Sequence, residues 1–323
     1  MSAHTHQTAP TQYIEANGTR FAYRRFGKAG GVPLVFNQHF TGTLDHWDPA
    51  VTDGLARGRE VILFNNAGIA SSSGEVPTTV AGMGANAIAF IKALGLKQVD
   101  VLGFSFGGLV AQEIAVQAPD LVRRLVLVGT GPRSGEAMDS LTPEAQEIFG
   151  ATYDPPEELW LNVHFTRSEE SRAAGRRFLK RFLQRQQDRD PPVSDKVAPA
   201  QIAALGKWGA KQENAYEYLK TIKQPTLVVN GDNDVIIYSI NSWILQQNIP
   251  NAQLIIYPDA SHGSQYQYPE RFVGHVAGFL SEADPSRSRD YERTVGVEKC
   301  SGVGTEHHYS DYAVYARGAS TGK

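Results

Sequence analysis

The chain has 323 residues, of which 41% are hydrophobic and 20% are charged, and its formal net charge at pH 7 is −3. This balance is typical of a soluble globular protein, and it does not indicate binding to nucleic acid or to an anionic membrane. The length suffices for one large α/β domain with an insertion, or for two domains.

Cysteine usage and the N-terminus predict a cytoplasmic protein. Cys300 is the single cysteine, so no disulfide can form within the chain, which fits a reducing compartment. The segment from Met1 to Gln12 is polar and lacks the apolar core of a signal peptide. No stretch approaches about 18 consecutive apolar residues, so we expect no membrane-spanning helix.

The first half of the chain predicts strands that alternate with helices. We expect residues 1–11 to form a flexible terminus, and the dipeptide Asn17-Gly18 predicts a tight turn between the two strands of a hairpin. Continuous apolar runs predict buried strands at 32–37, 60–65, 98–102 and 125–129. Helices are expected at 44–55, 78–94 and 109–115. Such alternation predicts a parallel sheet that is covered by helices on both faces.

The pattern changes after Pro132, where a long helical segment begins. Helices are expected at 143–149, 156–163, 169–187, 199–211 and 214–222, and no strand is predicted from 133 to 222. A run of Arg and Lys residues between 172 and 189 covers more than one helix face and is flanked by acidic residues. We therefore interpret this run as a solvated helix face and not as a nucleic-acid surface.

The sheet resumes in the last third of the chain. Strands are expected at 225–231 and 252–257, and helices at 238–247 and 269–280. Residues 285–323 are polar and glycine-rich without any periodicity, so we expect a tail outside the fold.

The motif Gly103-Phe104-Ser105-Phe106-Gly107 lies between a predicted strand and a predicted helix. A pattern this short also occurs by chance, but in a strand–turn–helix context Gly-x-Ser-x-Gly predicts a nucleophile elbow. Its glycines avoid clashes at a sharp turn, and the following helix directs backbone N–H groups at the reaction centre. Ser105 is therefore the candidate nucleophile.

Two later loops supply candidates for a base and an acid. A serine nucleophile needs an imidazole to take its proton and a carboxylate to orient that imidazole. In parallel sheets of this type the partners follow the serine in the order acid, then histidine, each after a later strand. Asp234 follows the strand that ends at Gly231, and His262 follows the strand that ends at Tyr257. Both loops belong to the carboxyl edge of the sheet, where Ser105 emerges.

Over about residues 12–283 the chain resembles the α/β-hydrolase superfamily, in its elbow, its Gly231–Asp234 turn and its Ala260–Gly263 loop. The resemblance implies a mostly parallel eight-stranded sheet with helices on both faces. It divides the chain into a core at 12–132 and 223–284 and an inserted helical cap at 133–222.

The resemblance also implies which carboxylate is catalytic. The last residue of the family's Gly-x-x-Asp turn corresponds to Asp234, and Asp232 is the second choice. Asp259 is also close to His262 in the sequence, but we interpret it as a turn residue of the loop.

The family's oxyanion hole corresponds to Phe40 and Phe106. Phe106 follows the nucleophile, and the family's His-Gly-aromatic sequence corresponds to Gln38-His39-Phe40. His39 stands where a glycine is common, so the loop departs from the usual conformation. We interpret His39 as a structural or substrate-contacting residue, with the role of base as the alternative.

A second loop departs further from the family. Its Asp-x-Arg-Gly-x-Gly-x-Ser sequence corresponds to residues 65–72, where both charged residues are absent. We expect this change to affect stability and pocket shape more than chemistry.

The cap supplies candidate pocket residues: Met138, Trp160 and His164, with Phe165 and Trp208 as further aromatic candidates. Each has packing within the cap as its alternative role. No cluster of His, Cys, Asp and Glu has metal-ligand spacing, and no Gly-x-Gly-x-x-Gly follows the first parallel strand, so we expect no metal and no cofactor. We expect a small-molecule substrate as the partner, and the sequence is compatible with a homodimer.

Together these residues predict a serine hydrolase that cleaves a carboxylic ester or a lactone through an acyl group on Ser105. One alternative is a different reaction of the same triad: carbon–carbon bond hydrolysis, perhydrolysis or cofactor-free oxygen chemistry. The other is a ligand receptor with slow turnover. The resemblance excludes dehalogenases and epoxide hydrolases, which carry an aspartate at the position of Ser105.

Overall fold

An eight-stranded sheet lies at the centre of residues 4–282, the part of the chain that the computed structural model describes. Its strands are β1 (Gln12–Ala16), β2 (Thr19–Gly27), β3 (Leu34–Asn37), β4 (Glu60–Phe64), β5 (Val99–Phe104), β6 (Val122–Val128), β7 (Thr226–Gly231) and β8 (Ala252–Tyr257). Their order in the sheet is β1-β2-β4-β3-β5-β6-β7-β8. The pairs β1–β2 and β2–β4 are antiparallel and the other five pairs are parallel. The predicted α/β class with a mostly parallel sheet is confirmed.

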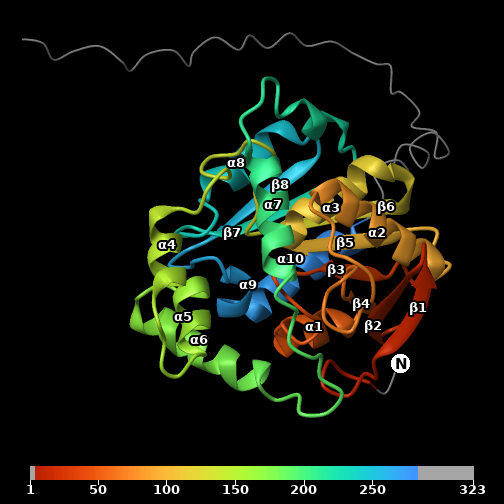
Figure 1. Cartoon of the computed structure of the whole chain (residues 1–323), viewed down its shortest axis with the longest axis horizontal. Coiled ribbons are helices and arrows are strands. Elements are labelled where there is room, and N and C mark those ends of the chain that lie inside the picture. Colours follow the sequence, from red (N-terminus) through yellow and green to blue (C-terminus); the bar gives the residue numbers. More distant parts are fainter. Residues whose placement is uncertain (1–3, 283–323) are drawn as a thin grey trace, which may run out of the picture. The chain divides into compact units, whose positions relative to one another are not determined.

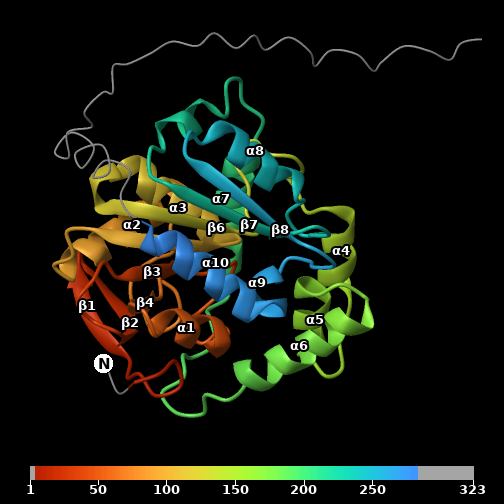
Figure 2. The same cartoon turned by 180° about the vertical axis from the view of Figure 1, so that it is seen from behind.

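Helices cover both faces of the sheet, as the two opposite views show (Figure 1, Figure 2). One face carries α1 (Pro49–Ala56) and α10 (Pro269–Ser281), and the other carries α2 (Val80–Ala93), α3 (Phe106–Gln117) and α8 (Ile240–Asn248). Each face has its own hydrophobic core, because successive strand residues point to opposite sides. On β5, for example, Val101 joins the core beneath α2 and α3, whereas Leu102 joins the core beneath α1 and α10.

The register of the parallel strands brings several loops to one edge. Asn37 at the end of β3 pairs with Gly103, and Phe104 at the end of β5 pairs with Val128 of β6. The carboxyl ends of β7 and β8 also coincide. The loops after these strands therefore meet at the carboxyl edge of the sheet, where ligands bind in open α/β folds.

Residues 133–222, called the cap segment below, are helical throughout their regular parts. They form α4 (Pro143–Gly150), α5 (Glu158–His164), α6 (Glu169–Phe182), α7 (Val197–Gly209) and the 3₁₀ helix η2 (Glu217–Thr221). A short helix that we did not predict, α9 (Ser264–Gln267), packs against α6. No helix within residues 4–282 is both long and apolar enough to cross a membrane.

The N-terminal segment packs against the core, so the expectation of a flexible terminus at residues 1–11 does not hold for residues 6–9. His6 and Ala9 are buried, and the backbone N–H of His6 donates to Asp53 of α1 at 2.7 Å. Arg185 donates to the carbonyl oxygens of His6, Gln7 and Ala9 at 2.7–2.9 Å. A polar sequence gave no sign of this contact, because its partner lies some 180 positions away in the chain. The predicted tail at 285–323 lies outside the described residues.

The first helix after β3 begins later than predicted. We expected a helix at 44–55, but α1 begins at Pro49, and the Asp48 side chain caps it by accepting a hydrogen bond from the N–H of Ala50 at 2.9 Å. Proline at the first helical position and aspartate before it are the usual signals of a helix start. His46 consequently lies in the loop at the carboxyl edge of the sheet and not on a helix.

Candidate active site

Ser105 occupies a strained turn between β5 and α3. Its backbone has φ 55° and ψ −122°, a conformation that few residues other than glycine adopt. The strain persists because Ser105 N donates to the Val128 carbonyl at 2.8 Å, and Thr130 Oγ1 donates to the Ser105 carbonyl at 2.9 Å. A Cβ on Gly103 would lie 2.2 Å from the carbonyl oxygen of Gly107, so the elbow closes only with glycine there.

The three residues predicted to form a triad are hydrogen-bonded in series. Ser105 Oγ lies 2.8 Å from Nε2 of His262, and Nδ1 of His262 lies 2.9 Å from Oδ2 of Asp234. All three side chains are buried. The carboxylate can only accept, so Nδ1 carries the proton and Nε2 is left to accept the hydrogen bond from Ser105. This is the order that a nucleophile, a base and an orienting acid require.

Of the three acidic candidates, Asp234 is the one that contacts His262. Its other oxygen, Oδ1, accepts from the N–H groups of Ile236 and Ile237 at 2.9 and 3.0 Å, which fixes the carboxylate. Asp232 accepts from the N–H of Ala260 at 3.2 Å, and Asp259 binds hydroxyl groups of the cap segment. These two carboxylates therefore shape the loops around the site.

Residues 38–43 form the loop that contains Phe40, called the Phe40 loop below. Two of its side chains, Gln38 and His39, differ from the family pattern and form hydrogen bonds with the backbone of this loop. Gln38 donates to the Thr43 carbonyl at 3.0 Å and accepts from the N–H of His39 at 2.8 Å. His39 Nδ1 donates to the Phe40 carbonyl at 2.8 Å. Across the site, Phe106 is the first residue of α3, so its N–H is one of the unpaired donors at a helix N-terminus.

Four aromatic and imidazole rings form a continuous wall beside the triad, and we call them the ring wall: His39, His46, Trp160 and His164. His39 and His46 stack with centroids 5.5 Å apart and planes 1° apart. Trp160 contacts all three histidines at 5.2–5.5 Å, and His164 stacks on His262 at 5.9 Å.

The ring wall is uncharged at neutral pH. Burial lowers the pKa of His39 to about 3 and that of His46 to about 4, and burial also lowers the pKa of His164. Nε2 of His39 and Nδ1 of His164 are buried without a hydrogen-bond partner among the described residues. Since Nδ1 of His39 carries its proton, its Nε2 is free to accept a hydrogen bond.

Residues 32–269 match the model of a protein family described as alpha/beta hydrolase fold. The chain belongs to the alpha/beta hydrolase fold family. A solved alpha/beta hydrolase fold protein from Chitinophaga pinensis is 42% identical with a TM-score of 0.80, and the match covers 87% of this chain and 100% of that protein.

Two relatives named for an activity are each 31% identical to this chain. A 2-hydroxymuconate semialdehyde hydrolase from Pseudomonas putida matches over 220 residues, which are 63% of this chain and 69% of the relative. A pimeloyl-(acyl-carrier protein) methyl ester esterase from Nitrosomonas europaea matches over 180 residues, which are 54% of this chain and 68% of the relative. These two relatives are named for different substrates.

The corner between α5 and α6 is bonded directly to the loop that carries His262. Gly263 N donates to the His164 carbonyl at 3.0 Å, and a Cβ on Gly263 would lie 2.5 Å from Cβ of His164. Thr166 and Ser168 donate to the two oxygens of Asp259 at 2.7 and 2.5 Å. Asp259 thus has a wider role than the turn residue that the sequence indicated.

The other pocket candidates of this alpha/beta hydrolase lie in its cores. Met138 and Trp208 are buried in the core on the side of α2 and α3, and Phe165 packs against Phe178 of α6 with centroids 5.8 Å apart. Among the cap candidates, Trp160 and His164 alone belong to the ring wall.

A carboxylate from the cap segment binds the loop at residues 65–72, which lacks both charged residues of the family pattern. Asp190 accepts from Nδ2 of Asn65 at 3.0 Å, from Oγ of Ser71 at 2.6 Å and from the N–H of Leu44 at 2.9 Å. The N–H of Asp190 in turn donates to Asp45 at 2.7 Å. A loop that has no charged residue of its own thus receives a negative charge from the connection between α6 and α7.

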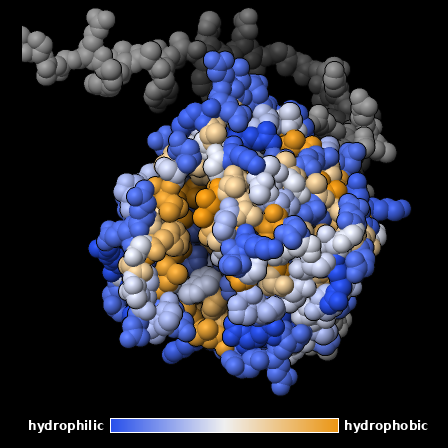
Figure 3. Space-filling view, viewed as in Figure 1, coloured by the Kyte–Doolittle hydropathy of each residue, from blue (hydrophilic) through white to orange (hydrophobic). Residues whose placement is uncertain are grey.

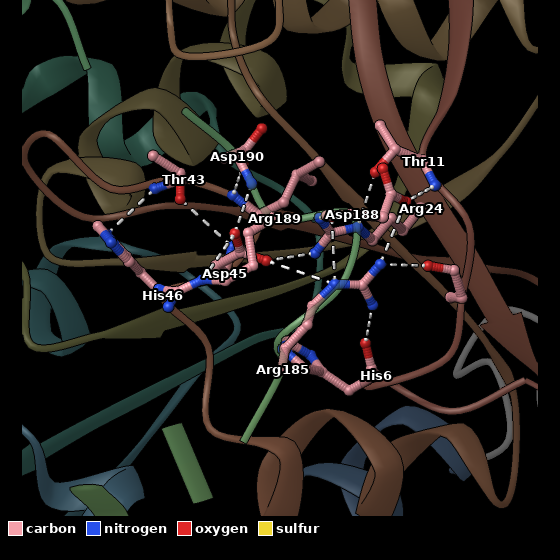
Figure 4. A network of polar contacts seen from close by, with 12 residues as sticks. His6, Thr11, Arg24, Thr43, Asp45, His46, Arg185, Asp188, Arg189 and Asp190 are labelled. Atoms are coloured by element: carbon pink, nitrogen blue, oxygen red, sulfur yellow. Dashed lines mark hydrogen bonds and ion pairs between the residues drawn. The ribbon is translucent and has the colours of Figure 1, made fainter. Parts of the chain in front are cut away.

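The basic run of the cap segment is not only a solvated face, so that prediction is wrong for two of its members. Arg181 forms a double hydrogen bond with Asp48 at 2.8 and 2.6 Å, and Arg185 is 5% exposed. Figure 4 shows Arg185 beside Arg24, both directed at Asp45, with Asp188 and Asp190 closing the network. This network joins the connection between α6 and α7 to the core.

A small cavity adjoins the Phe40 loop. Its volume is about 30 Å³, and its lining includes Gln38, His39, Phe106, Gly107 and Gln201. Such a volume suffices for about two water molecules. On the outside, Figure 3 shows a hollow flanked by hydrophobic residues, between α4 and α5 on one side and α7 on the other. Within residues 4–282, no three His, Cys, Asp or Glu side chains are grouped so that they could hold a metal ion.

Proposed function

We propose that this chain is a serine hydrolase that cleaves a carboxylic ester or a lactone through an acyl-enzyme on Ser105. The observation that carries the proposal is the hydrogen-bonded series from Ser105 through His262 to Asp234, built on a strained elbow. A serine of ordinary reactivity becomes a nucleophile when an oriented, neutral imidazole accepts its proton.

The geometry supports a two-step reaction. Ser105 Oγ attacks the carbonyl carbon while His262 Nε2 takes its proton, and His262 then gives this proton to the leaving oxygen. Water attacks the acyl-enzyme by the same exchange and releases the acid. Asp234 accepts the hydrogen bond from Nδ1 of His262 and stabilises the imidazolium that forms.

The N–H groups of Phe40 and Phe106 would bind the oxyanion in both steps. Phe106 suits this role because it begins α3 directly after Ser105, where the helix presents unpaired donors. Phe40 suits it because its loop follows β3, the strand beside β5 in the sheet. Each donor of this kind contributes roughly a factor of 10²–10³ to kcat.

The esterase from N. europaea supports an ester as the substrate. The ring wall adds a physical reason, because its neutral rings suit an uncharged or planar group next to the scissile bond. The relative from P. putida supports a second candidate, hydrolysis of a substrate like 2-hydroxymuconate semialdehyde by the same triad. The two candidates differ in their substrate, and the residues around Ser105 suit either reaction.

A labelling and turnover experiment tests the proposal. Purified protein is treated with a fluorophosphonate probe and assayed with aryl esters, alkyl esters, lactones and 2-hydroxymuconate semialdehyde. We expect covalent labelling of Ser105, its loss in Ser105→Ala, and steady turnover of an ester or a lactone. Labelling that persists in Ser105→Ala contradicts the nucleophile. Turnover of the semialdehyde alone favours the second candidate, and a burst without steady turnover favours a receptor.

A further inference from the structure

The peptide group between Phe40 and Thr41 is held at both of its ends. Its carbonyl oxygen accepts a hydrogen bond from Nδ1 of His39 at 2.8 Å. Its N–H, which belongs to Thr41, donates to Oε1 of Gln201 at 2.7 Å. A peptide group is a rigid plane, so two bonds at opposite ends fix its orientation.

Thr41 would not adopt its conformation without such support. Its φ is 54°, in the left-handed region, where a β-branched residue is a clear outlier. Conformations of this kind persist where the surroundings hold them, and they gather at functional sites. The bond to Gln201 is one of the contacts that hold Thr41, beside the turn formed by the N–H of Gly42 and the His39 carbonyl at 2.9 Å.

Gln201 reaches this loop from a distant part of the chain. It lies on α7 of the cap segment, 160 positions after Thr41, and its side chain is buried. Gln201 also lines the small cavity together with Phe106 and Gly107, so the side chain that binds the N–H of Thr41 also borders the Phe106 side of the proposed oxyanion hole.

We propose that Gln201 is a positioning residue that holds the Phe40 loop in its catalytic conformation, so that α7 of the cap segment completes the oxyanion hole. The inference rests on the proposed function. Only the φ and ψ angles of Phe40 separate its own N–H from the peptide group that Gln201 and His39 fix. When that group turns, the N–H of Phe40 turns away from the oxyanion, and binding of the substrate in its ground state changes less than the reaction rate.

The same helix provides a matched control. Lys207 of α7 donates through Nζ to the Thr78 carbonyl at 3.0 Å, an exposed contact between the cap segment and the start of α2. Lys207→Ala removes a contact of α7 with the core but does not touch the Phe40 loop. If substitutions on α7 act by loosening the whole helix, the Gln201 and Lys207 variants should both lose activity. If Gln201 positions the Phe40 loop, only the Gln201 variant should lose activity.

Two substitutions at Gln201 separate hydrogen bonding from packing. Gln201→Leu keeps a similar volume without the acceptor oxygen. Gln201→Glu keeps an acceptor for the N–H of Thr41. We expect hydrogen exchange of the backbone at residues 39–42 to quicken at least tenfold in Gln201→Leu, and to stay within about threefold of the unchanged protein in Gln201→Glu and Lys207→Ala.

The kinetic experiment measures kcat and KM separately for each variant, with an ester that the wild-type protein hydrolyses. We expect Gln201→Leu to lower kcat and the rate of fluorophosphonate labelling by roughly 10- to 100-fold at nearly constant KM, with Lys207→Ala close to the unchanged protein. Unchanged exchange in Gln201→Leu overturns the inference, and so does an equal loss in Lys207→Ala. Neither of these results contradicts the proposed function. The proposed function fails if the wild-type protein shows no labelling of Ser105. In that case the hydrogen-exchange measurement still tests whether Gln201 positions the Phe40 loop.

Discussion

His164 of the cap segment lies flat against His262, with ring centroids 5.9 Å apart and an angle of 13° between the planes. Phe104 contacts the same imidazole at 5.0 Å, so two rings restrict the orientation of His262. The backbone carbonyl of His164 also accepts the N–H of Gly263, the next residue after His262. One residue of the cap segment therefore touches both the ring and the backbone of the histidine loop.

We expect His164→Ala to lower kcat by about tenfold or more. Without the ring of His164, the imidazole of His262 can change its orientation, and water can reach the face that His164 covers. His164→Phe keeps a ring in the same place, and we expect its kcat to stay within about threefold of the unchanged protein. Steady-state kinetics on the preferred ester decide between these outcomes. If both variants lose activity equally, the ring nitrogen matters and stacking does not explain the role of His164.

Substitution of the acid residues tests the order of the triad. Asp234→Asn should lower kcat by about 10⁴-fold, because an amide opposite Nδ1 favours the wrong tautomer of His262. Asp232→Asn should have little effect, since this carboxylate accepts a bond from the N–H of Ala260 and lies outside the series. Both variants can be compared by kcat and by the rate of fluorophosphonate labelling. A larger loss in Asp232→Asn would reassign the acid.

Local patterns were sufficient to predict the sheet and the position of Ser105. Continuous apolar runs mark buried strands, and the glycines at 103 and 107 are required by backbone contacts of 2.1–2.2 Å that any Cβ would make. Family resemblance pointed to Asp234 over Asp232, and the structure brings Asp234 to His262. The buried strands, the elbow and the acid turn each depend on a few neighbouring residues, so they can be recognised in the sequence.

Contacts between distant segments left no local signal. Arg185 belongs to a basic run that looks solvated, yet it binds carbonyl oxygens of the N-terminal segment. Gln201 is one polar residue on a helix, and nothing near it in the sequence indicates a bond to Thr41. In each case the partner lies 160 or more positions away, and only the fold brings the two together.

Buried histidines make the stability of the fold depend on pH. Burial lowers the pKa of His6 to about 3, well below its ordinary value of 6.5, so the folded state keeps His6 neutral while the unfolded state binds a proton. The unfolded state therefore holds more protons between about pH 3 and 6.5, and the free energy of unfolding falls as the pH falls through this window.

We expect His6→Asn to flatten this dependence, because it removes one such site and leaves Ser105, His262 and Asp234 unchanged. The slope of the free energy of unfolding between pH 4.5 and 5.5 should decrease by about 1.4 kcal/mol per pH unit, the value for one proton. Urea unfolding at several pH values measures it. An unchanged slope would mean that His6 is accessible to protons in the folded state.

The carboxylate of Asp190 and the amide of Asn65 form a pair whose members can be exchanged. Asn65→Asp restores the aspartate that family members carry, but it places a second carboxylate about 3 Å from Asp190. Two like charges at this distance repel each other, and we expect this variant to lose about 1–3 kcal/mol of unfolding free energy.

The double variant Asn65→Asp, Asp190→Asn again has one carboxylate facing one amide, so most of the loss should be recovered. Urea unfolding of the two single variants and the double variant forms a double-mutant cycle, whose coupling energy isolates this pair. Additive losses would show that the negative charge in this loop has no preferred partner and that Asp190 does not replace the family's aspartate.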